Sequence, residues 1–302
     1  MKKKLATILR AAALVQLLCA TSALAQTQTL ERIQKSGQVN LGYLADQPPF
    51  SYQSADGKVG GYVIELCMAV VQTLRQRLHF PELRANYIRV DRTNGLEMVE
   101  GGRVDLLCSA VPETLEARQR VSFSIPVYLG GIGVAVRTNA PAALVRVLTG
   151  QVAHTGPNWR ATINGGLEYN VYAVFAGTTS ESWVRDRLTG LGVIAKVVPV
   201  KTYGAGLQMV ASGQADAFFA DRAVLTTTAA QRQDSDLQVL DRRFTAEPAA
   251  LVLQRGDENF RLAVDTALSG LYRSGKVLDD YSRYFGTATE SVQTLFEAYG
   301  LP

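Results

Sequence analysis

Short apolar runs alternate with amphipathic segments along most of the chain. The first alternation begins at Val39 with the run VNLGYLA, which is short enough to be a buried strand. Two prolines, Pro48 and Pro49, stop this strand. From Tyr62 to Leu78 the apolar residues recur at three- and four-residue spacing, as on a helix packed along one face. We therefore expect a βα unit, and open α/β sheets bind ligands at the carboxyl ends of such strands.

Further units of the same kind follow the first. Strands are expected at 85–90, 104–108, 121–128, 130–136, 171–176, 194–200, 215–221 and 249–253. Helices are expected at 95–100, 114–120, 204–212, 259–274, 277–284 and 291–298, and another helix starts within 177–181 and ends near 191. Strands that alternate with helices predict mainly parallel sheets. The segment 149–166 is rich in Gly, Thr, Asn and Pro, and we interpret it as a surface excursion.

The order of these elements predicts two lobes. The chain leaves the first lobe near 133 and returns to it near 247, so residues 26–133 and 247–302 form lobe 1 and residues 134–246 form lobe 2. Two crossings make a hinge, and a ligand held between the lobes would favour closure.

The N-terminal segment is typical of a secretory signal. Its basic start is followed by the apolar core 11–18 and by the small-x-small sequence Ala23-Leu24-Ala25. The apolar core is too short to span a bilayer comfortably. Cys19 suggests a lipoprotein, but Leu17 and Leu18 are bulkier than that processing usually accepts. Residues 1–25 are therefore predicted to be a signal peptide, and the exported product begins at Gln26.

Removing this segment also changes the charge of the chain. The whole chain has 31 basic and 27 acidic side chains, but four of the basic ones lie in the signal, so the remainder is balanced. The pI of the whole chain, near 8.9, therefore reflects the N-terminal segment and gives no reason to expect nucleic acid or a membrane surface as a partner. Two cysteines remain, Cys67 and Cys108, and an exported protein meets an oxidising compartment. We hypothesise one disulfide between the first helix and a nearby strand.

One run in the first βα unit resembles a known family. The sequence from Pro48 to Leu66 reads PPFSY…DGKxxGY…EL, as at the start of family 3 periplasmic solute-binding proteins, the polar amino-acid receptors of ABC importers. The resemblance covers essentially the whole mature chain, to the Tyr-Phe-Gly run at 284–286. It implies an α/β, two-lobed periplasmic-binding-protein fold with mainly parallel sheets and a two-segment hinge.

The same resemblance implies a function. The protein would work in the periplasm as a monomer, without a cofactor and without being an enzyme. It would close on a small polar solute, an amino acid or derivative, and deliver it to an ABC permease in the inner membrane. The family's Gly-Thr-Thr run, here Gly177 to Thr179, holds the ligand's α-carboxylate. The aspartate of its DAxxAD run, here Asp221, pairs with the α-ammonium.

The residues themselves leave alternatives open at both positions. Thr178 or Thr179 can cap a helix, with Glu181 completing a pattern like a capping box. Free N–H groups at a helix start also attract a carboxylate. Asp221 ends a strand, where it would face the cleft, but a helix begins at once, so the carboxylate can also serve as its cap.

The first lobe departs from the family pattern. The family places Thr-x-x-Arg after its third strand, whereas here Ala117 stands at the arginine position and Arg118 comes one residue late. One residue turns a helical side chain by about 100°, so Arg118 either reaches the site through a slip in register or is a surface arginine. Ser109 is a further ligand candidate, and Asp46 faces the cleft or caps a turn. Phe50 is interpreted as core rather than ligand cover.

Arg92 and Asn94 lie in a loop that matches a substrate-facing segment of the family, displaced by one residue.

Catalytic and metal motifs are absent from the sequence. Its only histidines are His79 and His154, and it has no Cys-x-x-Cys, His-Glu-x-x-His or Walker-type phosphate loop. Two alternatives to import remain, a periplasmic sensory or adaptor module and a dehydratase-like enzyme on the same fold. Permease genes nearby would favour import and a histidine kinase gene sensing, whereas an enzyme should carry a cleft carboxylate or lysine with a shifted pKa.

Overall fold

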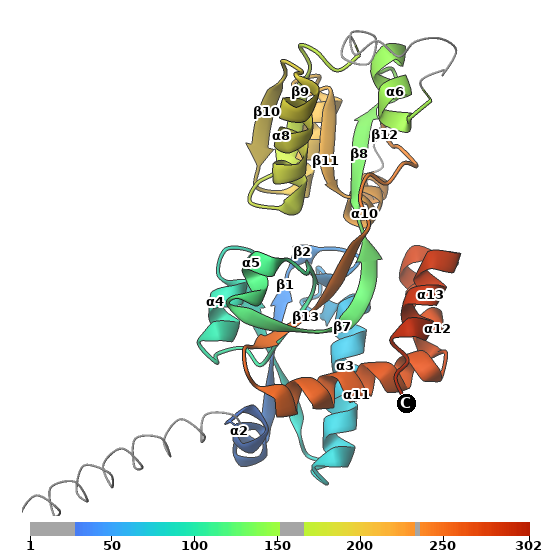
Figure 1. Ribbon diagram of the computed structural model, residues 1–302. Helices are drawn as coiled ribbons and strands as arrows, with labels where there is room; N and C mark the ends of the chain where they lie inside the picture. Colours follow the sequence, from blue (N-terminus) through green and yellow to red (C-terminus); the bar gives the residue numbers. More distant parts are fainter. Residues whose placement is uncertain (1–27, 152–165, 233–235) are drawn as a thin grey trace, which may run out of the picture.

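The computed structural model describes residues 28–151, 166–232 and 236–302 (Figure 1). The predicted signal peptide, His154 and most of the predicted excursion at 149–166 lie outside the described residues. The described chain contains two five-stranded sheets, one below the other in Figure 1, with two chain segments running between them.

The first sheet has the strand order β5-β1-β6-β13-β7. Its strands are β1 (Gln38–Leu44), β5 (Arg84–Val90), β6 (Leu106–Pro112), β7 (Val121–Gly130) and β13 (Glu247–Gln254). Strand β1 pairs in parallel with β5 and β6, whereas β13 pairs antiparallel with β6 and β7. This sheet and its helices form the lower lobe of Figure 1, lobe 1.

The second sheet has the order β10-β9-β11-β8-β12. Its strands are β8 (Ile132–Arg137), β9 (Val171–Phe175), β10 (Lys196–Val200), β11 (Ala217–Asp221) and β12 (Leu237–Val239). Strand β9 is parallel to β10 and β11, and β8 is antiparallel to β11 and β12. The predicted two lobes are present, but both sheets are mixed rather than mainly parallel. The βα units supply the parallel half, and the strands on either side of the crossings supply the antiparallel half.

The remaining elements cover these sheets. A small antiparallel sheet of β2 (Asp46–Gln47), β3 (Ser51–Gln53) and β4 (Val59–Gly60) precedes the first long helix. The helices of lobe 1 are α2 (Gln28–Ser36), α3 (Tyr62–Arg77), α4 (Gly95–Glu100), α5 (Leu115–Arg118), α11 (Glu258–Arg273), α12 (Lys276–Phe285) and α13 (Glu290–Ala298). Those of lobe 2 are α6 (Ala142–Thr149), α8 (Thr179–Leu191), α9 (Tyr203–Ala211) and α10 (Arg222–Arg232).

The core of lobe 1 forms where helix α3 meets the sheet. Its residues Leu66, Val70 and Leu74 lie on one helical face and are fully buried, as the apolar spacing predicts. Phe50 is also buried, with its ring centroid 4.7 Å from that of Tyr128. The interpretation of Phe50 as a core residue is therefore confirmed.

The two crossings between the sheets lie against each other. Strands β7 and β8 meet at Gly131, where an added Cβ would lie only 2.0 Å from the carbonyl oxygen of Thr245 on the returning segment. Only glycine therefore allows so close an approach. The Ile132 N–H donates to the Thr245 hydroxyl at 2.9 Å, and Glu247 pairs with Gly130. The lobe limits 26–133 with 247–302 and 134–246 remain a prediction.

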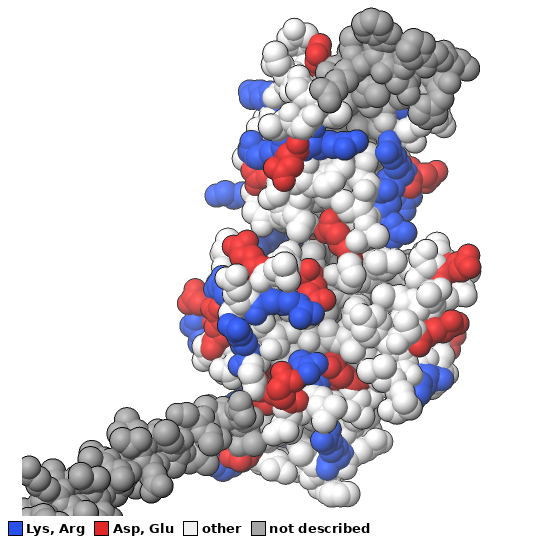
Figure 2. Space-filling model, viewed as in Figure 1, with Lys and Arg blue, Asp and Glu red and all other residues white. Residues whose placement is uncertain are grey.

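Cys67 of α3 and Cys108 of β6 form a disulfide, which confirms the hypothesis drawn from the sequence. Both residues are fully buried. On the face shown in Figure 2, basic and acidic side chains are interspersed, in keeping with the equal numbers of basic and acidic residues in 26–302. Among the described residues, every helix is too short or too polar to cross a membrane.

Candidate functional site

Asp221 is the last residue of β11 and lies beside the crossing between the lobes. Its Oδ1 accepts hydrogen bonds from the N–H groups of Ala223 at 3.0 Å and Val224 at 3.2 Å, so it caps α10. Its Oδ2 lies 3.1 Å from the position that a Cβ on Gly130 would take. The carboxylate therefore caps the helix with one oxygen and turns the other toward the crossing.

Burial raises the pKa of Asp221 to about 6. Hydrogen bonds from the N–H groups of Val224, Ala223 and Gly131 oppose this rise, and the negative charge of Glu247 adds to it. At neutral pH the group is an ionised carboxylate in an environment that disfavours its charge. A cation that approaches such a group stabilises its ionised form.

Glu247 brings a second carboxylate to the same place. It is the first residue of β13, and the hydroxyl of Thr179 donates to its Oε2 at 2.9 Å. The hydroxyl of Thr245 donates to its Oε1 at 2.7 Å. Glu247 thus connects the start of α8 to the returning crossing. Sequence reasoning missed it, although an acidic residue directly before the apolar run of the returning strand was a usable signal.

The start of α8 follows the capping expectation only in part. Glu181 accepts the Gly177 N–H at 2.9 Å, and this bond, together with Arg185, lowers the pKa of Glu181. Thr178 stands at the N-cap, but its hydroxyl donates to the carbonyl of Phe175 at 2.8 Å instead of capping the helix. The first backbone bond of α8 runs from the N–H of Glu181 to the carbonyl of Thr178. The N–H groups of Thr179 and Ser180 come before it, so this end of the helix favours an anion.

Arg92 extends from lobe 1 to lobe 2. It follows β5 in the chain, and its Cζ lies 4.6 Å from the ring centroid of Phe175 and 5.4 Å from that of Tyr203. Phe175 ends β9 and Tyr203 begins α9, so both rings belong to lobe 2. Stacking of a guanidinium on aromatic faces is a favourable contact. Sequence reasoning placed Arg92 in a substrate-facing loop but assigned it no role.

Three charged side chains around Tyr203 shift the pKa of its hydroxyl. Burial raises the pKa of its hydroxyl, the charge of Arg92 lowers it, and the charges of Asp221 and Asp46 raise it. A guanidinium and two carboxylates, from different strands and loops, therefore act on one ring. Asp46, which is exposed on β2, belongs to this group through its charge.

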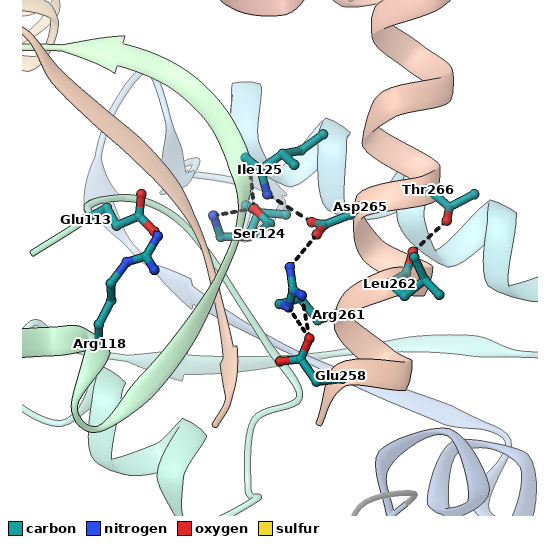
Figure 3. A network of polar contacts seen from close by, with 10 residues as sticks. Glu113, Arg118, Ser124, Ile125, Glu258, Arg261, Leu262, Asp265 and Thr266 are labelled. Atoms are coloured by element: carbon teal, nitrogen blue, oxygen red, sulfur yellow. Dashed lines mark hydrogen bonds and ion pairs between the residues drawn. The ribbon is translucent and has the colours of Figure 1, made fainter. Parts of the chain in front are cut away.

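Ser109 and Arg118 have other partners. Ser109 is buried and its hydroxyl donates to Oε1 of Gln47 at 2.6 Å, which fastens the loop of β2 to β6. Arg118 is exposed and pairs with Glu113, as Figure 3 shows. Thr114 caps α5 by accepting the N–H of Ala117 at 3.1 Å, so the helix keeps its register without the slip that Arg118 would need.

The structure thus brings some of the candidates together and separates others. Asp221 lies beside the crossing, and Thr179 reaches it through Glu247. Thr178 precedes Thr179 in the chain, and Asp46 acts on Tyr203 through its charge. Ser109 and Arg118 are engaged elsewhere. Within the described ranges, no cluster of three His, Cys, Asp or Glu side chains could hold a metal ion.

The hydroxyl of Thr179 allows a direct test. If it helps to hold a ligand while bonded to Glu247, Thr179→Val should weaken binding about tenfold, the worth of one hydrogen bond to a charged group. Thr179→Ser keeps the hydroxyl and should bind nearly as wild type. Isothermal titration calorimetry measures both. Equal affinity of the valine variant and wild type would limit Thr179 to its bond with Glu247.

Comparison with known proteins identifies the family to which this chain belongs. The family model described as bacterial extracellular solute-binding proteins, family 3, matches residues 39–287. An L-glutamate/L-aspartate-binding protein of Pseudomonas aeruginosa is 28% identical over 265 residues, which covers 86% of this chain and 80% of the relative. The glutamate/aspartate import solute-binding protein of Escherichia coli is 24% identical over 258 residues, 85% of this chain and 79% of the relative.

Solved structures show the same fold. An ancestral amino acid-binding protein described as a precursor of cyclohexadienyl dehydratase matches with a TM-score of 0.68 at 23% identity. The match covers 85% of this chain and 99% of the ancestral protein.

Proposed function

We propose that this chain, which belongs to the bacterial extracellular solute-binding proteins of family 3, binds a zwitterionic amino acid at the crossing between its lobes. One arrangement carries the proposal: Arg92 of lobe 1 lies over rings of lobe 2, and the carboxylate of Asp221 faces the crossing between the lobes. Arg92 supplies a cation from lobe 1, and Asp221 supplies a carboxylate from lobe 2. A small molecule that carries one ammonium and one carboxylate matches this pair.

Further side chains support binding between the lobes. Asp221 is ionised at neutral pH although its surroundings raise its pKa, so an ammonium would relieve an existing cost. The N–H groups at the start of α8 offer donors next to it. The hydroxyl of Thr179 donates its proton to Glu247, so its oxygen can accept a hydrogen bond from an ammonium. Contacts from both lobes would favour a closed state over an open one.

The names of the family and of a relative support an importer partner and an extracytoplasmic compartment. The E. coli relative is named for import of glutamate and aspartate, and the family is extracellular. We therefore infer that this protein works as a monomer in the periplasm after removal of residues 1–25, and that it delivers its ligand to an ABC permease. Thr178, Thr179, Asp221 and Asp46 are the proposed ligand-binding residues, and Ser109 acts through Gln47.

A thermal-shift screen tests the proposal. The mature protein is unfolded and refolded to remove carried-over ligand, and is then heated with each of the common L-amino acids and with opines, dicarboxylates and quaternary amines. A ligand at about 100 times its Kd adds about 2.7 kcal/mol to the free energy of unfolding, which raises Tm by several degrees at this size. A shift with an amino acid supports the proposal, and a flat panel on folded protein contradicts it.

One observation favours a second candidate, a dehydratase-like enzyme. Asp221 is a partly buried carboxylate with a pKa of about 6, within the range that suits a general acid or base. The membership in a family of binding proteins favours binding over catalysis. Recovering the bound ligand after long incubation and measuring its mass separates the two. Loss of water from the ligand, abolished by Asp221→Asn, would establish the enzyme.

A further inference from the structure

The guanidinium of Arg92 has an unused edge at the boundary between the lobes. Its Cζ lies over the ring of Phe175, 4.6 Å from the centroid. Its Nε and Nη2 are buried, and neither meets a hydrogen-bond partner among the residues that the structure describes. The hydroxyl of Tyr203 is close enough to interact with the guanidinium, but it does not satisfy these two nitrogens.

These two nitrogens form a defined binding edge. In a planar guanidinium, Nε–H and one Nη2–H point from the same side, and their spacing matches the two oxygens of a carboxylate. A buried N–H without a partner costs about 1–3 kcal/mol, and more in a charged group. The Phe175 ring lies beneath the guanidinium and limits its rotation. Because both nitrogens are buried, an anion reaches this edge only when the lobes move apart.

From this geometry we propose that Arg92 is the clamp for a carboxylate of the ligand, through a bidentate pair from Nε and Nη2. The inference rests on the proposed function and assigns one half of the zwitterion to a named residue. Asp221, which acts on the same Tyr203 ring, would receive the ammonium. An uncharged or purely cationic solute would leave the Arg92 edge unpaired.

The alternative clamp, Arg118, is unsuited to this task. Its side chain is 58% exposed and its guanidinium already pairs with Glu113 (Figure 3). Taking Arg118 to a ligand would break that pair, whereas the Arg92 edge gives up no bond. The two arginines belong to the same lobe, so changing each to glutamine makes a matched comparison.

A merely structural role for Arg92 predicts a different result. If its stacking on Phe175 and Tyr203 only holds the lobes together, loss of the guanidinium would weaken every ligand by the same factor. A clamp affects only ligands that have the carboxylate. The discriminating measurement is therefore the ratio of affinities for an amino acid and for its amide.

The experiment uses Arg92→Gln, Arg92→Lys and Arg118→Gln in the mature protein. Titration calorimetry compares the amino acid that gives the largest thermal shift with its α-carboxamide and, where its side chain is acidic, with its side-chain amide. We expect wild type to prefer the free acid over one of these amides. Arg92→Gln should lose about thirtyfold or more toward the free acid and little toward that amide. Arg92→Lys keeps the charge without the fork and should fall between, and Arg118→Gln should bind as wild type.

Each contrary result has its own meaning. Unchanged affinity of Arg92→Gln, or an equal loss for acid and amides, would overturn the clamp and leave the proposed function intact. A loss confined to Arg118→Gln would move the clamp to that residue. A flat amino-acid panel on wild type would remove the proposed function and the clamp together. Circular dichroism confirms that each variant folds, and Arg92→Lys carries the comparison if Arg92→Gln does not.

Discussion

Asp221→Asn is expected to weaken the binding of an amine-bearing ligand and, at the same time, to stabilise the ligand-free protein. Removing one partner of a desolvated charge pair costs about 2–5 kcal/mol in binding, and Asp221→Ala should show the full loss. Asparagine keeps an oxygen that can accept the N–H groups of Ala223 and Val224, so the cap on α10 survives, while its NH2 group no longer accepts the N–H of Gly131. The loss of affinity in the asparagine variant then reports on charge rather than on the helix.

The stabilising effect has a defined pH dependence. The pKa of Asp221 is about 6 in the folded protein, against about 4 when unfolded, so the folded state holds the proton more tightly. The contribution of Asp221 to the free energy of unfolding is fully present below about pH 4 and is lost as the pH rises through 6. Above pH 6 the ionised carboxylate costs roughly 1–3 kcal/mol, the upper figure being the whole pKa difference.

Urea unfolding of ligand-free wild type and Asp221→Asn, repeated from pH 4 to pH 8, measures this cost. The variant should be more stable above pH 6, and the difference should shrink toward zero near pH 4. Ligand affinity of wild type should fall below pH 6, as Asp221 takes up a proton and its charge is lost. An asparagine variant less stable than wild type at pH 8 would contradict the burial cost assigned to Asp221.

Most of the elements could be predicted from the sequence because local patterns determine them. The apolar spacing from Tyr62 to Leu78 gives a helix wherever it packs, and the structure has α3 at Tyr62–Arg77. Capping chemistry is equally local, as at Thr202, which accepts the N–H of Ala205 at 3.1 Å. The pairing direction of strands is not local. It depends on which strands return from the other lobe, so both sheets contain an antiparallel half that alternation alone did not predict.

The candidate site was predicted less completely, and for the same reason. Asp221 and Thr179 stand at strand and helix ends, where the sequence marks them. Arg92 and Glu247 were marked only weakly, by a loop position and by an acidic residue before the returning strand, since each acquires its partners only when distant segments meet. Ser109 stays a predicted ligand residue, and the structure adds a partner that the sequence does not mark, because the Ser109 hydroxyl donates to Gln47. Arg118 likewise has a partner within lobe 1, because its guanidinium forms an ion pair with Glu113.

Reduction of the Cys67–Cys108 disulfide should lower the free energy of unfolding by about 4 kcal/mol at 25 °C. The bridge joins residues 41 apart in sequence, and its removal restores the entropy of that loop to the unfolded chain, on the chain-entropy view of such cross-links. The disulfide also joins α3 to β6. In β6, Cys108 is followed by Ser109, whose hydroxyl bonds to Gln47 in the loop that also carries Asp46. Loss of the bridge is therefore expected to loosen the first-lobe side of the site as well.

Urea unfolding of the same wild-type protein with and without dithiothreitol isolates the cross-link, because both sulfur atoms stay in the core. The variant with Cys67→Ala and Cys108→Ala serves as control and should not respond to reductant. It should be less stable than reduced wild type, since the two substitutions leave cavities among fully buried neighbours. Because both sulfurs are buried, reductant should act mainly through opened molecules, so reduction should accelerate as urea is added. Two free thiols found in unfolded, unreduced protein would show that the bridge does not form.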